Sequence, residues 1–179
     1  MRQRAATFHD ANPAPTSVCG LGILVPSPRE VKTYDLKPEM SAEEVTRQLE
    51  KRMCDFGFVL VNYANPDMVG HTGVLPAALK AVAKVDECIG RLWTAAQKCE
   101  MAMVVTADHG NIETMIDPET GEPFTAHTLN PVPIYLCDPR VQGARLRRDG
   151  ILADVAPTLL QIMGLEKPAA MSGKSLLST

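Results

Sequence analysis

The run FGFVLVNYANPDMVGH, residues 56–71, carries the strongest structural signal in this chain, because an apolar segment leads directly into polar residues. Residues 56–63 form a continuous apolar run of strand length, which is typical of a strand buried on both faces. The run MAMVVT at 101–106 has the same character. Strand, helix and strand in this order predict a parallel α/β layer. The helix is predicted from Pro76, which suits a first turn, and from one apolar stripe at helical spacing: Leu75, Leu79, Val82, Val85, Ile89, Leu92 and Trp93.

Weaker signals complete the outline of the chain. Short strands are expected at residues 21–25 and 132–136, each closed by prolines. Ser41 followed by Glu44 is a capping-box pattern that predicts a helix up to about Cys54. Asp154 is expected to cap a last helix, which Gly164 ends. Residues 1–20 hold no period and are predicted to be an irregular N-terminal segment, so the domain is expected to span 21–179.

Bulk composition limits the classes of function. A chain of 179 residues with 45% apolar content can form one domain with a real core. A formal net charge of -3 argues against nucleic acid or an anionic membrane as the main partner. The N-terminus lacks the apolar stretch of a secretory signal. Five cysteines without a CxxC pair predict reduced thiols in a cytoplasmic protein.

Three short polar runs bring together five residues of the kinds that bind metals. The runs are NPDMVGH (65–71), TADHGN (106–111) and TAHT (125–128), and the residues are Asp67, His71, Asp108, His109 and His127. The first two runs follow predicted strands, and ligands of open α/β sheets collect beyond the carboxyl ends of strands. A turn predicted at DPETG (117–121) would carry the chain out and back, returning His127 towards Asp108 and His109.

Each run also has an ordinary structural explanation. Asp67 could cap a helix with His71 on the surface, and Asp-His-Gly could be a simple turn. His127 could be a hydrogen-bonded packing residue. Metal binding, however, accounts for all five residues together, with Asp108 and His109 serving either two different ions or one ion and one phosphate oxygen. Mixed carboxylate and imidazole ligation without cysteine suits Mn²⁺, Zn²⁺ or a similar ion that holds phosphate oxygens, rather than a structural zinc site.

Longer motifs resemble the C-terminal portion of cofactor-independent (2,3-bisphosphoglycerate-independent) phosphoglycerate mutase, of the alkaline phosphatase superfamily. The superfamily-level match is TADHGNIE (106–113) with AHT (126–128). The motifs SPREVKTYDLKPEMSAEEV (27–45), NYANPDMVGHTG (62–73) and AHTLNPVPIYL (126–136) are more specific to the mutase. The similarity runs from about Leu24 to the C-terminus. It implies a three-layer, alkaline-phosphatase-like α/β sheet flanked by helices, present here as a partial domain after a divergent segment 1–20.

The resemblance also implies an activity, interconversion of 3-phosphoglycerate and 2-phosphoglycerate in glycolysis through a phosphoserine. By motif, Asp67, His71 and His127 resemble the three ligands of one metal, and Asp108 and His109 resemble two ligands of a second. The expected cofactor is Mn²⁺, with Zn²⁺ or Co²⁺ as alternatives. The family's nucleophilic serine and its substrate-binding domain belong to a segment that this sequence does not match, so no catalytic residue and no substrate-binding residue is assigned.

The serines of this chain do not supply a replacement nucleophile, because none has the base, metal or helix-start neighbourhood that activates a hydroxyl: Ser17, Ser27, Ser41, Ser172, Ser175 and Ser178. Three hypotheses therefore stay open. The chain is the metal-binding part of a phosphoglycerate mutase, probed by 3-phosphoglycerate turnover. It is another phosphotransferase or hydrolase of the superfamily, probed by a panel of phosphate and sulfate esters. Or it is a non-catalytic fragment that binds metal and pairs with a separate N-terminal half or with itself, probed by its size in solution.

Overall fold

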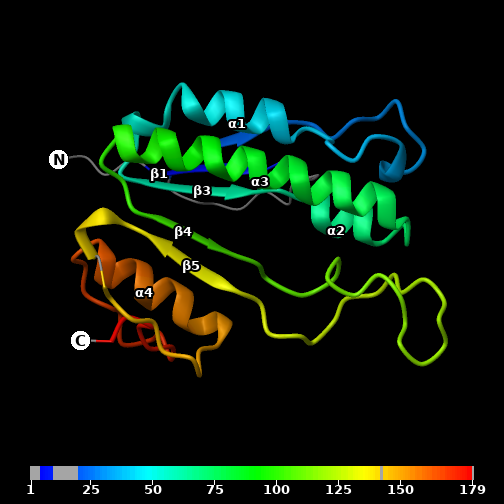
Figure 1. The fold of residues 1–179 in the computed structure, drawn as a ribbon. Helices are drawn as coiled ribbons and strands as arrows, with labels where there is room; N and C mark the ends of the chain where they lie inside the picture. Colours follow the sequence, from blue (N-terminus) through cyan, green and yellow to red (C-terminus); the bar gives the residue numbers. More distant parts are fainter. Residues whose placement is uncertain (1–4, 10–19, 142, 179) are drawn as a thin grey trace. The chain divides into compact units, whose positions relative to one another are not determined.

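The computed structural model describes residues 5–9, 20–141 and 143–178, which fold as two compact units (Figure 1). Unit 1 contains the described residues of Met1–Met101 together with His109–Pro133. Unit 2 contains Ala102–Asp108 and the described residues of Ile134–Thr179. Each unit has its own sheet and its own helices, and each is described by itself below.

The sheet of unit 1 has three parallel strands in the order β2-β1-β3. Strand β1 (Ala5–His9) lies in the middle and pairs with β2 (Gly20–Leu24) on one side and β3 (Phe58–Asn62) on the other. Strands β2 and β3 confirm the strands expected near 21–25 and 56–63. The prediction that residues 1–20 are irregular is wrong for β1, whose apolar run is too short to stand out by period alone. Residues 1–4 and 10–19 lie outside the described part of the chain.

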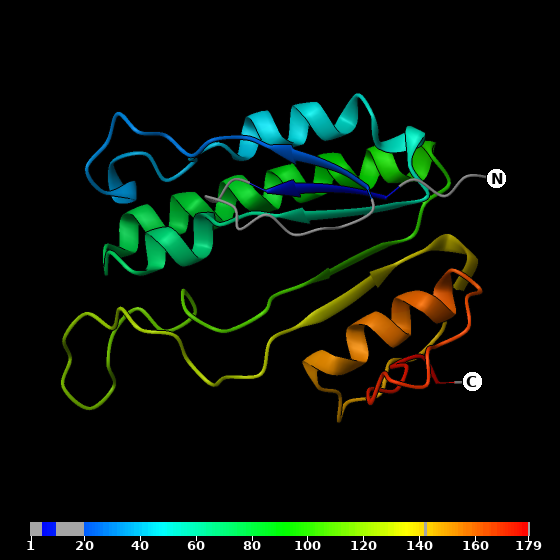
Figure 2. The ribbon, with the colours of Figure 1, turned by 180° about the vertical axis from the view of Figure 1, so that it is seen from behind.

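Helices cover one face of this sheet. Figures 1 and 2, which view the molecule from opposite sides, both show α1 (Ala42–Glu50) and α3 (Leu75–Lys98) running beside each other on the same side of the strands. The fully buried side chains of Val45 and Leu49 come from α1. Short 3-10 turns, Tyr34–Leu36 and Met53–Asp55, flank α1. These layers confirm the predicted α/β class.

The capping box predicted at the start of α1 does not form, although the helix begins at Ala42 as expected. The Ser41 hydroxyl donates instead to the backbone oxygen of Pro26, at 2.6 Å. Glu44 is also occupied, since its two carboxylate oxygens accept from the guanidinium of Arg47 at 2.6 and 2.8 Å. The loop before the helix therefore replaces the reciprocal cap with a longer-range bond that the local pattern does not encode.

The predicted single apolar stripe of α3 is also wrong in part. The buried residues of the helix are mostly small: Ala77, Ala78, Ala81, Cys88, Leu92 and Ala96. By contrast Leu79 is 63% exposed, and Leu75 and Val82 are exposed beside it. Small side chains let α3 approach its neighbouring helices closely, so the larger residues of the first turns point outward. Likewise Leu60 of β3 is 54% exposed, because the helices cover one face of the sheet and the expected burial on both faces does not hold.

A disulfide in unit 1 joins the turn after α1 to the end of α3. Cys54 in the 3-10 turn after α1 is bonded to Cys99 at the C-terminus of α3, with a Cα–Cα distance of 5.1 Å. The prediction that all five cysteines are reduced is therefore wrong for this pair, since two helix ends bring together residues 45 positions apart in sequence. Cys88 and Cys137 are free thiols, and Cys19 lies outside the described residues.

Unit 2 pairs β4 (Met103–Thr106) with β5 (Ile134–Cys137) in antiparallel register, whereas the pairs of unit 1 are parallel. The strands predicted at 56–63 and 101–106 lie in different units, so their predicted place in one parallel layer stays a prediction. Its main helix, α4, spans Val155–Ile162 and is followed by Gly164 at a positive φ of 67°. Short 3-10 turns span Pro139–Val141 and Leu152–Asp154. Among the described residues, no helix is both long and apolar enough to cross a bilayer.

One buried carboxylate organises the loops of unit 2. Asp154 accepts the backbone N–H groups of Lys174 at 2.7 Å and Ile151 at 3.1 Å, and the Arg147 guanidinium donates to it at 3.0 Å. The N–H groups of Lys174 and Ile151 lower the pKa of the Asp154 carboxyl. Burial raises this pKa, but by less, so the pKa lies below its ordinary value. Asp154 thus ties the turn before α4 to the last residues of the chain.

Candidate metal centre

A short helix that follows β3 presents the first two predicted ligands. Helix α2 (Asn65–Gly70) begins with Pro66 in its first turn, which needs no N–H partner there. Asp67 and His71 stand four residues apart, and side chains at this spacing share one helix face. The His71 Nε2 atom lies 3.1 Å from Asp67 Oδ1. The local sequence alone therefore places one carboxylate and one imidazole side by side.

The third ligand arrives from a distant part of the chain by a turn. Asp117 N donates to the carbonyl of Glu122 at 2.9 Å, and the Asp117 side chain accepts the N–H groups of Glu119 and Thr120. The tight turn predicted at 117–121 is confirmed. Antiparallel bridges Ile116↔Pro123 and Gly110↔Thr128 continue it as a long loop that goes out and comes back.

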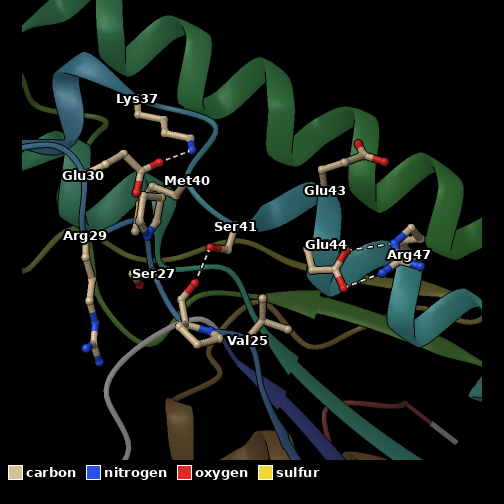
Figure 3. A pocket seen from close by; sticks show the side chains of 12 residues that line it. Val25, Ser27, Arg29, Glu30, Lys37, Met40, Ser41, Glu43, Glu44 and Arg47 are labelled. Atoms are coloured by element: carbon tan, nitrogen blue, oxygen red, sulfur yellow. Dashed lines mark hydrogen bonds and ion pairs between the residues drawn. The ribbon is translucent and has the colours of Figure 1, made fainter.

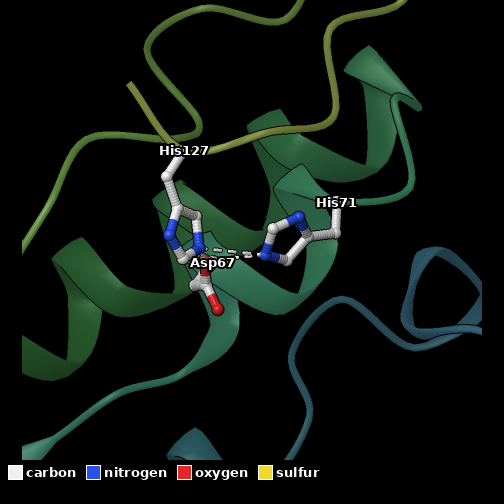
Figure 4. Close-up of side chains that lie close together, drawn as sticks. All are labelled: Asp67, His71 and His127. Atoms are coloured by element: carbon white, nitrogen blue, oxygen red, sulfur yellow. Dashed lines mark hydrogen bonds and ion pairs between the residues drawn. The ribbon is translucent and has the colours of Figure 1, made fainter. Parts of the chain in front are cut away.

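The returning side of this loop places His127 next to α2 (Figure 4). The His127 Nε2 atom lies 3.0 Å from Asp67 Oδ1 and 3.2 Å from His71 Nε2. All three side chains belong to unit 1, and their ligand atoms point towards one another. The structure thus brings together three of the five residues predicted as metal ligands.

A backbone carbonyl determines which nitrogen of His71 is available. The Nδ1 atom of His71 lies 2.6 Å from the carbonyl oxygen of Thr125. A carbonyl only accepts hydrogen bonds, so His71 Nδ1 carries the proton and donates it. In the neutral ring, Nε2 then has a free lone pair directed at Asp67 and His127. Metal-binding histidines are commonly fixed in this way by a hydrogen bond from the other ring nitrogen.

The donor set fits a divalent ion. Ligand atoms about 2.1 Å from one ion, in tetrahedral or octahedral arrangement, are themselves about 3.0–3.4 Å apart. The three separations here are 3.0, 3.1 and 3.2 Å. One carboxylate and two imidazoles suit Mn²⁺, Zn²⁺ or Co²⁺.

The remaining two predicted ligands lie in different units. The His109 Nε2 atom is 3.9 Å from Asp67 Oδ1, and the His109 ring stacks on His127 with centroids 3.8 Å apart. His109 therefore borders the cluster of three. Asp108 is exposed, two residues beyond β4, and belongs to unit 2. Its predicted sharing of a second metal with His109 stays a prediction.

Residues that were not predicted complete the surroundings. Asn111 donates to Asp67 Oδ1 at 2.8 Å, and its own N–H donates to Glu113 at 2.7 Å. Glu113 also accepts from Thr128 and from Asn130, which links the two sides of the loop. Partial burial alone would raise the pKa of Glu113, but the hydrogen bonds from Thr128 and Asn130 outweigh it and the pKa lies below its ordinary value. These residues lie inside the motifs at 106–113 and 126–136, but a sequence pattern does not show which residues they contact.

A separate pocket lies on unit 1, away from this cluster (Figure 3). It has a volume of about 480 Å³ and is lined by residues between Val25 and Arg47. Its charged groups largely pair with one another, Lys37 with Glu30 at 2.5 Å and Arg47 with Glu44 at 2.6 Å. None of the predicted metal ligands lines it.

Comparison with known proteins places the chain in a family of metal-dependent enzymes. Residues 17–167 match the model of the Metalloenzyme superfamily, and the chain belongs to that superfamily. It is 59% identical over 156 residues to the 2,3-bisphosphoglycerate-independent phosphoglycerate mutase of Myxococcus xanthus, and 56% identical over 160 residues to that of Rhodopirellula baltica. These matches include 86% and 87% of this chain but 30% and 29% of the relatives. The chain thus spans about 30% of the length of these relatives.

A solved structure confirms the fold. The phosphoglycerate mutase of Leishmania mexicana, determined at low cobalt concentration, superposes with a TM-score of 0.83 at 27% sequence identity. The match covers 99% of this chain and 37% of that one. The predicted alkaline-phosphatase-like α/β fold, present as a partial domain, is therefore confirmed, and so is the resemblance to phosphoglycerate mutases.

Proposed function

We propose that this chain supplies the metal-binding part of a phosphoglycerate mutase, which interconverts 3-phosphoglycerate and 2-phosphoglycerate in glycolysis by metal-assisted phosphoryl transfer. The observation that carries the proposal is the convergence of Asp67, His71 and His127 in a chain 59% identical to such a mutase. Relatives named as phosphoglycerate mutases support the substrate, and the family supports a divalent metal.

The proposed roles follow from the geometry of unit 1. Asp67, His71 and His127 would hold one ion, for which Mn²⁺ is the proposed identity and Zn²⁺ or Co²⁺ the alternatives. His109, 3.9 Å from Asp67, would hold a second ion together with Asp108. When bound, such ions polarise phosphate oxygens and stabilise the charge that develops during transfer. The stacking of His109 on His127 would restrain both rings, so that each keeps one nitrogen directed at its ion.

We infer that the chain needs a complementing polypeptide for turnover. The serines of the pocket, Ser27 and Ser41, lie with residues 25–47 rather than at the ligand cluster, and the Ser41 hydroxyl is already bonded to Pro26. A nucleophilic serine and a phosphoglycerate-binding domain would come from a polypeptide equivalent to the part of the relatives that this chain does not match. A non-catalytic metal-binding role in such a pair is the alternative proposal.

Metal binding is the first test. Titration calorimetry of the purified chain with Mn²⁺ should show binding, and Asp67→Ala should weaken it by at least about 100-fold, because a direct ligand is lost. Asp86→Ala is the matched control, since Asp86 is an exposed carboxylate on α3 and should leave binding unchanged. Equal Mn²⁺ affinity in the wild-type and Asp67→Ala chains would contradict the proposed ligand set.

Turnover is the second test. 3-Phosphoglycerate conversion would be measured for the chain alone and for the chain co-expressed with the unmatched part of the Myxococcus xanthus relative. We expect activity in the co-expressed pair and its loss with Asp67→Ala. Activity of the chain alone, sensitive to Asp67→Ala, would show that a nucleophile is present and refute the inferred need for a partner. Inactivity of the co-expressed pair, despite Mn²⁺ binding, would favour the non-catalytic alternative.

We also infer a cytoplasmic location, because the proposed substrate belongs to glycolysis. Disulfides are rare in the reducing cytosol. In that compartment the Cys54–Cys99 bond would be one of these uncommon disulfides.

A further inference from the structure

A buried carboxamide stands directly behind the ligand cluster. Asn111 is 5% exposed, and its Nδ2 atom lies 2.8 Å from Asp67 Oδ1 and 3.4 Å from His71 Nε2. The same nitrogen is 3.4 Å from the backbone oxygen of Asp67. Asn111 is therefore the one described neighbour whose side chain donates to the carboxylate of Asp67 from inside the protein.

The other end of the carboxamide shows why an amide occupies this position. Asn111 Oδ1 is buried and has no hydrogen-bond partner among the described residues. An unpartnered buried oxygen destabilises the fold, and an apolar side chain of similar shape would avoid that cost. We therefore propose that Asn111 is a positioning residue of the metal centre, whose amide N–H fixes the Asp67 carboxylate for metal binding.

A glycine on α2 makes room for this arrangement. A Cβ atom at Gly70 would lie 2.2 Å from Asn111 Oδ1 and 2.9 Å from its Cγ, closer than atoms can approach. Any larger residue at position 70 must therefore displace the carboxamide from Asp67. The position of Asn111 therefore depends on Gly70, because the absence of a side chain at Gly70 leaves space for the Asn111 carboxamide.

Hydrogen bonds also restrain the backbone of Asn111. Its N–H donates to Glu113, and Glu113 accepts from the hydroxyl of Thr128. The Thr128 N–H donates to the carbonyl of Gly110 at 2.8 Å. These bonds tie Asn111 to the segment that carries His127. The carboxamide therefore links the position of Asp67 to that of His127, which lies on the other side of the loop.

The chemical role is orientation of a ligand. With one N–H donated to Oδ1, the Asp67 carboxylate loses its freedom to rotate, and its remaining lone pairs stay directed at His71 and His127. Partners of this kind behind metal ligands change metal affinity by about 10–100-fold when they are removed. This inference rests on the proposed metal binding, and its test separates the two.

The test is a double-mutant cycle read by metal affinity rather than by turnover. Mn²⁺ affinity would be measured by calorimetry, and the visible spectrum of bound Co²⁺ would report the ligand geometry. Asn111→Ala removes the donor, and Gly70→Ala displaces it, so each should weaken Mn²⁺ binding by about 10–100-fold and alter the Co²⁺ spectrum. The double variant should bind about as well as either single one, because both changes remove the same interaction.

Gly90→Ala is the matched control, because Gly90 lies in α3 and a Cβ there would meet nothing within 4 Å. It should leave affinity and spectrum unchanged, and circular dichroism should show each variant folded. If Asn111→Ala does not fold, Gly70→Ala alone decides the question. Unchanged affinity and an unchanged Co²⁺ spectrum in the folded variants would overturn the role of Asn111 and leave the proposed function standing. A wild-type chain that binds neither ion would refute both.

Discussion

Reduction of the disulfide should strongly destabilise unit 1. The Cys54–Cys99 bond closes a loop of 45 residues, and this loop contains α2 with Asp67 and His71. In the chain-entropy treatment, a cross-link across that many residues stabilises the folded state by about 4 kcal/mol, because it restricts the unfolded chain. The change is Cys54→Ser, or dithiothreitol added to the wild-type chain, and both remove the same bond.

The assay can be directed at unit 1 alone. Trp93 is the sole tryptophan of the chain and lies in α3 of unit 1, so its fluorescence during urea unfolding reports on that unit. With a slope of about 2 kcal/mol per molar urea, a loss of about 4 kcal/mol lowers the midpoint by about 2 M. Dithiothreitol should have no further effect on Cys54→Ser.

A control and a contrary outcome complete this prediction. Cys137→Ser removes a free thiol in unit 2 and should leave the Trp93 transition where it is. If oxidised and reduced wild-type chains unfold at urea midpoints within about 0.3 M of each other, the loop is already constrained in the unfolded state and the entropic argument fails.

Three further outcomes are expected. Leu49→Ala should lower the stability of unit 1 by about 2–5 kcal/mol, because Leu49 is fully buried. Leu79→Ala should change that stability by less than about 0.5 kcal/mol, because Leu79 is 63% exposed. Urea titration of both variants checks this. The lowered pKa of Asp154, held mainly by the Lys174 N–H, gives stability that is complete above pH ~4 and lost as pH falls through the lower folded-state pKa. Acid titration by circular dichroism should therefore unfold unit 2, with a weaker pH dependence in Asp154→Asn. Finally, Mn²⁺ at about 100 times the wild-type Kd should stabilise the wild-type chain by about 2.7 kcal/mol and Asp67→Ala by no more than about 0.4 kcal/mol in thermal melts.

The sequence was most informative where one local pattern determines one element. The apolar runs at 56–63 and 101–106 became β3 and β4, because a few consecutive β-branched and aromatic side chains favour a strand. The i, i+4 spacing of Asp67 and His71 likewise placed them on one face of α2. Those statements needed no knowledge of the rest of the chain.

Features set by distant partners could not be predicted. The Ser41 hydroxyl donates to the backbone oxygen of Pro26, 15 positions earlier, and makes no hydrogen bond that caps its own helix. Leu79 is exposed because α3 packs through alanines, and periodicity does not say which of two apolar faces turns inward. The disulfide and Asn111 also depend on contacts between residues more than forty positions apart.

The middle position of β1 has a consequence for the order in which the chain can fold during synthesis. Ala5–His9 is synthesised before both of its neighbours, and β3 follows about 50 residues later. Before β3 is made, β2 is the one described strand with which β1 can pair, and the unpaired edges of these strands are open to other nascent chains. A truncated version that starts at residue 21 would remove the middle strand and leave β2 and β3 without a common partner. Residues 5–9 are therefore the ones that join β2 and β3 into one sheet.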